Sequence, residues 1–125
     1  MKILVIDDNR DLLEMVSYIL GLSGHHVIKA SCGMTGIEQA CRQKPDLVLL
    51  DIMMPGFDGF QTCQKLKSNP RTRCIPVFML TALEKISDVE KAFKTGADDY
   101  ITKPFDNDQL NDIICRKLNR YKSQV

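Results

Sequence analysis

KILVIDD, residues 2–8, is an apolar run that ends in two acids, and LVLLD, residues 47–51, ends in a third. Apolar runs of this length with β-branched residues are typical of buried strands in a parallel sheet. The carboxyl ends of such strands share one edge, where open α/β sheets bind ligands, so we expect Asp7, Asp8 and Asp51 to lie together. Because three carboxylates repel one another, this proximity favours a hard cation among them.

Outward from these two runs, strand and helix patterns alternate five times along the chain. Strands are expected at residues 2–7, 26–29, 46–51, 75–80 and 98–102. Apolar residues at helical spacing predict helices over residues 10–22, 34–41, 60–66, 86–93 and 110–118. Five such units predict one α/β domain, a three-layer sandwich with helices on both faces of a parallel sheet.

The order of the strands follows from their polarity. The runs at 2–7, 46–51 and 75–80 are almost wholly apolar and should be central, whereas 26–29 and 98–102 are shorter, more polar and suited to the edges. Right-handed crossovers then favour the order 2-1-3-4-5 in a doubly wound sheet. In that order the winding reverses between the first and third strands, beside the three acids.

Composition excludes several other classes of protein. The 125 residues, 44% of them hydrophobic, suit one soluble domain with a real core. A net charge of +1 gives no reason to expect binding to nucleic acid or to anionic membranes. No apolar run is long enough for a membrane span, and the first residues lack a signal-peptide pattern, so we expect a cytoplasmic protein. The five cysteines include no close pair, and we expect reduced, mostly buried thiols.

Two more strand ends carry side chains suited to a phosphoryl group. The hydroxyl of Thr81 can hydrogen-bond a phosphoryl oxygen, and the ammonium of Lys103 can pair with another. A carboxylate beside Mg²⁺ can attack phosphorus and form an acyl phosphate. The strand ends therefore favour phosphoryl chemistry, and the backbone carbonyl of Met53 could add a further oxygen ligand to the cation.

Each of these residues also has a structural interpretation. One residue of segment 7–9 should cap the following helix. Thr81 could cap the helix after it, and Lys103 could belong to a turn because Pro104 blocks continuation of the strand. These interpretations stay open for Thr81 and Lys103 taken singly, but capping alone does not explain three acids at two strand ends.

Other acids serve as a comparison. Asp46 and the pair at 98–99 precede their strands, so they should be solvated loop acids at the opposite edge of the sheet. Asp58 is expected to cap the third helix. Asp106 is expected to begin the fifth helix in a capping box with Gln109.

The four strand ends together resemble the receiver domain of two-component response regulators. The resemblance runs from residue 2 to residue 121 and rests on Asp7-Asp8, on Asp51 followed by MPGFDG (54–59), on Thr81-Ala82 and on Lys103-Pro104-Phe105. It implies a flavodoxin-like (βα)5 fold, with the receiver domain at residues 1–121 and a tail or the start of a linker at 122–125.

The resemblance implies a role for each site residue. Asp51 would accept the phosphoryl group and help to hold Mg²⁺ or Mn²⁺. Asp8 would bind this metal directly, Asp7 largely through water, and Met53 through its backbone carbonyl. Lys103 would bind the phosphoryl group and precede a cis peptide bond.

Thr81 and Tyr100 would form a switch pair that responds to phosphorylation. The phosphoryl donor would be a sensor histidine kinase or a histidine phosphotransfer protein. The face of the fourth helix, fifth strand and fifth helix would then control an output domain or a downstream protein, with a homodimer as one possible result. No turnover of an external substrate, direct nucleic-acid binding or membrane contact is implied.

Three rival functions remain open. A metal-dependent phosphatase with an aspartyl nucleophile would have an acid two residues after the nucleophile, where this chain has Met53. A carrier of flavin mononucleotide would need a phosphate-binding loop after the first strand, where Asp7 and Asp8 would repel phosphate. A degenerate receiver used only for binding would not need the intact acids, Thr81 and Lys103.

Overall fold

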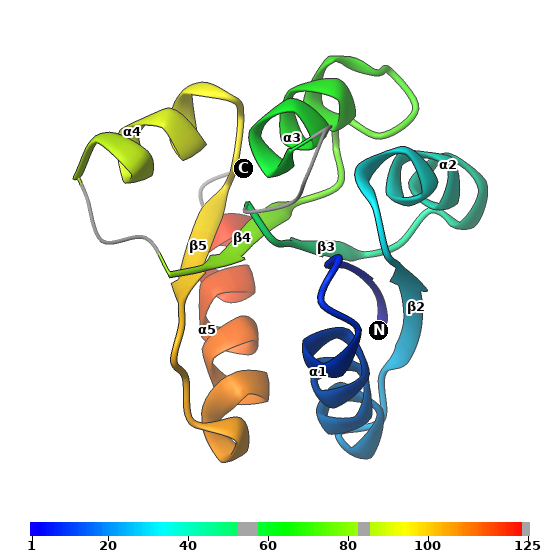
Figure 1. Cartoon of the computed structure of the whole chain (residues 1–125), viewed down its shortest axis with the longest axis vertical. Helices are drawn as coiled ribbons and strands as arrows, with labels where there is room; N and C mark the ends of the chain where they lie inside the picture. The colour runs from blue at the N-terminus through cyan, green and yellow to red at the C-terminus, as the bar shows by residue number, and fades with distance from the viewer. Residues whose placement is uncertain (53–57, 83–85, 124–125) are drawn as a thin grey trace.

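Five strands alternate with helices along the chain, as the periodicity predicts (Figure 1). The computed structural model describes residues 1–52, 58–82 and 86–123, with the side chains of residues 81 and 86–89 left out. The elements are β1 (Lys2–Ile6), α1 (Arg10–Leu22), β2 (His26–Ala30), α2 (Gly33–Gln43), β3 (Leu47–Leu50), α3 (Gly59–Ser68), β4 (Val77–Thr81), α4 (Ile86–Lys94), β5 (Asp99–Thr102), a 3₁₀ turn η1 (Asn107–Gln109) and α5 (Leu110–Ser123).

All neighbouring strands are parallel, and their order is β2-β1-β3-β4-β5. The predicted order 2-1-3-4-5 is therefore confirmed, with the two polar strands at the edges. The winding reverses between β1 and β3, which are direct neighbours in register from Ile3 with Leu47 to Ile6 with Leu50.

Side chains alternate between the two faces of the sheet, and each face has its own core. In Figure 1, α1 and α5 lie on one side of the sheet and α2, α3 and α4 on the other. The first core joins α1 and α5 to the sheet through Ile3, Val5, Leu13, Val16, Leu20, Leu47, Leu49, Phe78, Leu80, Ile101, Leu110, Ile114 and Leu118. The second core packs α2, α3 and α4 on Leu4, Ile6, Val48, Leu50, Val77 and Met79.

The strand boundaries differ slightly from the predicted ones. β4 begins at Val77 rather than at residue 75, because Pro76 has no N–H to donate to the sheet. Asp98 precedes β5, although its N–H donates to the Val77 carbonyl at 2.9 Å. At the C-terminal end, α5 continues to Ser123, two residues past the expected domain boundary at 121.

Gly96 caps the C-terminal end of α4, which finishes at Lys94. Its φ of 100° is in the left-handed region that glycine adopts without strain. The N–H of Gly96 donates to the Phe93 carbonyl at 3.0 Å, and the N–H of Ala97 donates to the Ala92 carbonyl at 3.2 Å. This pair of bonds is a Schellman motif, which satisfies carbonyls at the end of the helix.

The prediction of solvated loop acids holds for Asp46, which is an exposed loop residue, but it is wrong for Asp98 and Asp99. Asp98 forms an ion pair of 2.6 Å with Lys67, in which the two side chains are only 19% and 15% exposed. Its Oδ2 also accepts from the N–H of Val77 at 2.9 Å. Asp99 pairs with Lys117 at 3.1 Å, and Asp46 accepts from the N–H of Lys2 at 2.7 Å. Backbone N–H groups at the starts of β4 and β1 thus donate hydrogen bonds to Asp98 and Asp46.

The expectation of mostly buried cysteines is also wrong. All five are free thiols, but only Cys63 is fully buried, whereas Cys32 and Cys74 are exposed. Cys63 faces the core from α3, and Cys32 and Cys74 lie outside the helices and strands. Among the described residues, no helix combines the length and apolar character that a membrane crossing would need.

Candidate functional site

The three strand-end aspartates lie together at the carboxyl edge of the sheet. One oxygen from each of Asp7, Asp8 and Asp51 falls within a group whose members are all within 4.8 Å of one another. Asp7 and Asp51 are buried, with 2% and 6% of their surface exposed, whereas Asp8 is exposed. Two carboxylates therefore lie at the buried bottom of the site, and the third lies at its solvent-exposed opening.

Backbone hydrogen bonds of the sheet fix the two buried acids. The N–H of Asp7 donates to the Ala30 carbonyl of β2 at 3.1 Å, one residue beyond the end of β1. The N–H of Asp51 donates to the Ile6 carbonyl of β1 at 3.0 Å, one residue beyond the end of β3. The ladder thus continues into both acids, so their backbone positions follow from strand register.

Lys103 brings a positive charge to the two buried carboxylates. It follows β5, and its Nζ lies 3.7 Å from Asp7 Oδ2 and 3.6 Å from Asp51 Oδ1. The Lys103–Pro104 peptide bond is cis, as the family resemblance implies. Among the described residues of the cluster, one ammonium stands against three carboxylates, which leaves a net negative charge that favours a cation.

Asn9, rather than either acid, caps α1. Its Oδ1 accepts from the N–H of Leu12 at 3.2 Å. Its own N–H donates to Asp7 Oδ1 at 2.9 Å and thereby orients that carboxylate. Because Asn9 supplies the cap, helix capping does not explain the presence of Asp7 and Asp8.

One oxygen of Asp7 has no hydrogen-bond donor among the described residues. Asp7 Oδ2 is buried, and its nearest opposite charge is the Lys103 ammonium, which at 3.7 Å is beyond hydrogen-bonding distance. A buried charged oxygen without a donor is costly. An orphaned oxygen among other carboxylates fits the all-oxygen coordination that Mg²⁺ and Mn²⁺ prefer.

The first turn of α3 packs tightly against the backbone of Asp51. Asp58 caps this helix in a capping box, accepting from the N–H of Gln61 at 2.9 Å while Gln61 Oε1 accepts from the N–H of Asp58 at 3.0 Å. The N–H of Gly59 donates to the Ile52 carbonyl, and a side chain at Gly59 would collide with the Asp51 carbonyl oxygen. Sequence analysis missed this contact, although a glycine directly after a helix cap could have signalled it.

The remaining predicted residues are placed only in part. Thr81 ends β4 opposite Thr102, but its side chain is outside the description, and Met53 and the segment 54–57 lie outside the described residues. Tyr100 is half-buried on β5. Its ring meets Phe93 edge-on with centroids 6.0 Å apart.

Comparison with known proteins gives one consistent result. Residues 3–115 match the family described as "Response regulator receiver domain". The chain is 46% identical over 109 residues to the DNA-binding dual master transcriptional regulator RpaA of Synechocystis, covering 87% of this chain and 45% of that protein. It is 41% identical over 121 residues to the response regulator PleD of Caulobacter vibrioides, covering 97% of this chain and 26% of that protein.

Solved structures agree with the sequence matches. The chemotaxis protein CheY4 of Vibrio cholerae superposes with a TM-score of 0.87 at 26% identity, covering 92% of this chain and 96% of that one. The chain thus spans less than half the length of RpaA and PleD but nearly the whole of CheY4.

Proposed function

Because this chain belongs to the response regulator receiver domains of two-component systems, we propose that it stores a signal as an aspartyl phosphate on Asp51. The observation that supports this choice is the position of Asp51. Its carboxylate is buried between Asp7, Asp8 and the ammonium of Lys103, which lies 3.6 Å from Asp51 Oδ1. Asp8 is exposed and stands at the mouth of the same cluster.

In the proposed reaction, a carboxylate oxygen of Asp51 attacks the phosphorus of a phosphohistidine. An O–P bond forms, the N–P bond breaks, and its electron pair returns to the imidazole nitrogen. The Lys103 ammonium pairs with the phosphoryl oxygens and offsets their charge. The low solvent exposure of Asp51 keeps this pairing strong.

Asp7, Asp8, Asp51 and the carbonyl of Met53 are the proposed ligands of Mg²⁺ or Mn²⁺. When bound, this cation neutralises the charge that develops on the transferring phosphoryl group. Because the Asn9 N–H occupies Asp7 Oδ1, Asp7 would act on the cation through its Oδ2, largely by way of water.

The proposed donor is a cytoplasmic sensor histidine kinase or histidine phosphotransfer protein. Such a donor must contact surface next to Asp51, and α1 begins at the same edge of the sheet. This helix exposes Met15, Tyr18 and Leu22 at a spacing that lines one side. We assign the docking of the donor to this side of α1, because an exposed apolar stripe is typical of a protein interface.

The proposed switch pair is Thr81 with Tyr100. A phosphoryl group on Asp51 would draw the Thr81 hydroxyl toward it, and Tyr100 would rotate inward. Tyr100 touches Phe93 of α4 and has the Lys117 ammonium of α5 5.7 Å from its ring centre, so its movement would alter the face of α4, β5 and α5. That face would control an output domain, a downstream protein or a homodimer, without turnover of an external substrate.

Phosphorylation by acetyl phosphate tests the assignment of Asp51. In Mg²⁺ buffer the wild-type protein should gain the mass of one phosphoryl group, and Asp51→Asn should gain none because an amide is not a nucleophile toward phosphorus. Asp58→Asn is the matched control, since it changes a nearby acid that caps α3, and it should be labelled like wild type. Equal labelling of Asp51→Asn and wild type would refute the assignment.

A further inference from the structure

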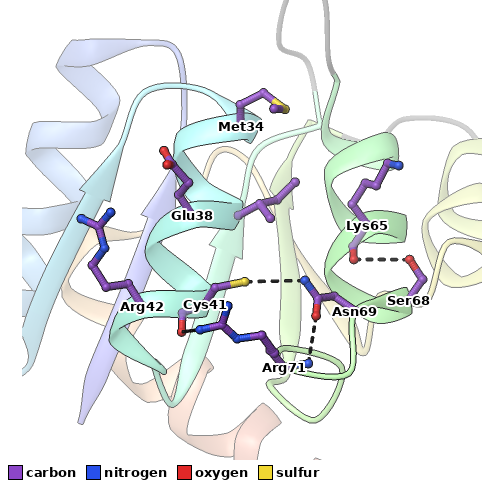
Figure 2. A pocket seen from close by; sticks show the side chains of 9 residues that line it. Met34, Glu38, Cys41, Arg42, Lys65, Ser68, Asn69 and Arg71 are labelled. Carbon is purple, nitrogen blue, oxygen red and sulfur yellow. Dashed lines mark hydrogen bonds between the residues drawn. The ribbon is translucent and has the colours of Figure 1, made fainter.

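A groove of about 800 Å³ runs between α2 and α3, away from the aspartate cluster. Its lining residues are Met34, Ile37, Glu38, Cys41, Arg42, Lys65, Ser68, Asn69 and Arg71. Figure 2 shows α2 forming one wall, α3 the other, and the loop after α3 closing one end. This volume is in the range of sites that bind ligands or peptide segments.

Apolar side chains of α2 line the groove lengthwise. Met34, Ile37 and Cys41 follow one another at intervals of three and four residues, so they lie on one side of the helix. Met34 is 65% exposed and Ile37 only partly buried, although both are apolar. Seven residues of helix extend about 10 Å, which is the length of two helical turns. The stripe thus matches a short helical partner.

Positive charges surround this stripe. Arg42, Lys65 and Arg71 all line the groove, and Glu38 is the one acid among its lining residues. None of these three cations forms an ion pair with any residue that the structure describes. In Figure 2 the side chains of Lys65 and Arg71 lie toward opposite ends of the groove. The groove therefore offers apolar contact and unpaired positive charge to the same occupant.

The closed end of the groove is held in shape by hydrogen bonds. Arg71 donates from its guanidinium to the Cys41 carbonyl at 3.4 Å, and the Asn69 amide donates to the Cys41 Sγ at 3.6 Å (Figure 2). The Arg71 N–H donates to the Asn69 Oδ1 at 2.9 Å, and Lys44 Nζ donates to the Arg71 carbonyl at 3.0 Å. The loop is thus tied to α2, so the groove is largely formed before any occupant binds.

We propose that this groove docks an amphipathic helix of a partner protein, with apolar residues at intervals of three or four and acids on both flanks. The apolar side would pack on Met34, Ile37 and Cys41, as in other helix-in-groove complexes. The flanking acids would pair with Lys65 on the α3 wall and with Arg71 in the loop at the closed end (Figure 2). The interface differs from the α1 stripe and from the α4–β5–α5 face, and it does not depend on phosphorylation of Asp51.

A synthetic helical peptide tests the proposal. The probe is a fluorescein-labelled peptide of about 18 residues, with leucines along one side and glutamates on both flanks. The second probe carries lysine at every glutamate position. Fluorescence anisotropy with the full chain should show binding of the acidic peptide, and binding of the lysine peptide at least about tenfold weaker.

Matched variants locate the binding site. Lys65→Glu and Met34→Asp should each weaken the acidic peptide at least about tenfold, because each removes one class of contact. Arg120→Glu and His26→Asp are the controls, since they reverse an exposed cation and place an aspartate at another exposed position, both outside the groove. Both controls should bind like wild type, and circular dichroism should show that all four variants are folded.

Several outcomes would overturn the proposal. These are no binding of the acidic peptide, equal binding of both peptides, unchanged binding by the groove variants, or equal loss in the controls. Sedimentation without peptide examines a second copy of the chain as the occupant. If the wild type is a dimer, and Lys65→Glu and Met34→Asp dissociate it but Arg120→Glu does not, the groove binds a second copy of this chain and not a partner helix. Labelling of Asp51 by acetyl phosphate is a separate readout that these variants should leave intact.

Discussion

Asp7 is buried and acidic, yet only one of its two oxygens accepts a hydrogen bond among the described residues. The other oxygen faces the Lys103 ammonium at 3.7 Å and shares the cluster with Asp8 and Asp51. This arrangement lowers the free energy of unfolding of the metal-free protein, because one cation does not balance three carboxylates. Residues that serve function often lower stability in this way.

Asp7→Asn should therefore stabilise the metal-free protein. The change removes one of three mutually repelling charges while keeping an oxygen that can accept from the Asn9 N–H, and we expect the free energy of unfolding in EDTA to rise by about 1 kcal/mol. Adding Mg²⁺ should stabilise the wild type more than this variant, because the variant loses a carboxylate of the metal site. Urea unfolding monitored by circular dichroism, with EDTA or with Mg²⁺, measures both effects.

Asp46→Asn is the control for this experiment, since Asp46 is an exposed acid at the opposite edge of the sheet. Its response to Mg²⁺ should equal that of wild type. A loss of stability of Asp7→Asn in EDTA would show that the Lys103 ion pair outweighs the repulsion among the acids.

The cysteines differ in pKa for identifiable reasons. Burial raises the pKa of the Cys63 thiol to about 11. The hydroxyl of Thr35, 3.2 Å from the Cys32 sulfur, lowers the pKa of exposed Cys32. Only the thiolate is nucleophilic, so a short treatment with iodoacetamide at about pH 8 should alkylate Cys32 far faster than Cys63. Peptide mass spectrometry measures the order in which the two cysteines are alkylated, and alkylation of Cys63 before Cys32 would contradict the prediction.

Because the pKa of Cys63 is raised in the folded protein, the contribution of this thiol to folding stability falls at high pH. Below the ordinary thiol pKa of 9.0, Cys63 is neutral in both the folded and the unfolded chain and its contribution is fully present. As pH rises from 9.0 toward about 11, the unfolded chain loses the proton first, so this contribution to folding is lost.

At the scale of elements, the start of α3 is held tightly against the site. Asp58 and Gln61 satisfy two backbone N–H groups reciprocally, and Gly59 leaves no room for a side chain beside the Asp51 carbonyl. The cap therefore fixes the helix against the strand end that carries the proposed phosphoacceptor.

Asp58→Ala should lower the free energy of unfolding by about 1 kcal/mol, because the Gln61 N–H loses its acceptor. Asp58→Asn keeps an oxygen at the same position and should cost much less. The midpoint of urea unfolding distinguishes the two variants. Equal midpoints for wild type and Asp58→Ala would mean that water replaces the cap without loss.

The capping pattern also shows how far sequence can locate helix ends. DGFQ at 58–61 and DNDQ at 106–109 have the same capping-box spacing. Sequence analysis expected the box at Asp106, but Asp106 Oδ1 accepts from the N–H of Asp108 and begins the 3₁₀ turn η1. The spacing alone does not distinguish a 3₁₀ start from an α start, since both put an N–H within reach of the aspartate.

For the whole molecule, the sequence predicted the sheet and the position of the acids well. Apolar content separated the central strands from the edges, and the order of the strands follows from that difference together with the handedness of crossovers. Because the carboxyl ends of β1 and β3 are neighbours, Asp51 lies beside Asp7 and Asp8 although more than forty positions separate it from them in sequence. Regular backbone geometry is sufficient for these predictions.

Features that depend on packing between elements were not predicted from the sequence. Lys67 of α3 reaches Asp98 before β5 and also donates to the Ile75 carbonyl at 2.8 Å. The groove between α2 and α3 needs the loop after α3, which Arg71 ties back to Cys41. Such contacts depend on where separate helices and loops lie on the sheet, and no local periodicity reports that placement.

Ionic strength should act unevenly on the charges of this molecule. The Lys67–Asp98 pair is 2.6 Å long with side chains 15% and 19% exposed, so dissolved ions have little access to it. The Lys29–Glu14 pair is 46% and 66% exposed and is open to screening. The same salt that weakens surface attraction at the groove would leave the tie between α3 and β5 in place. Salt thus separates the charges that recruit other molecules from those that hold the fold.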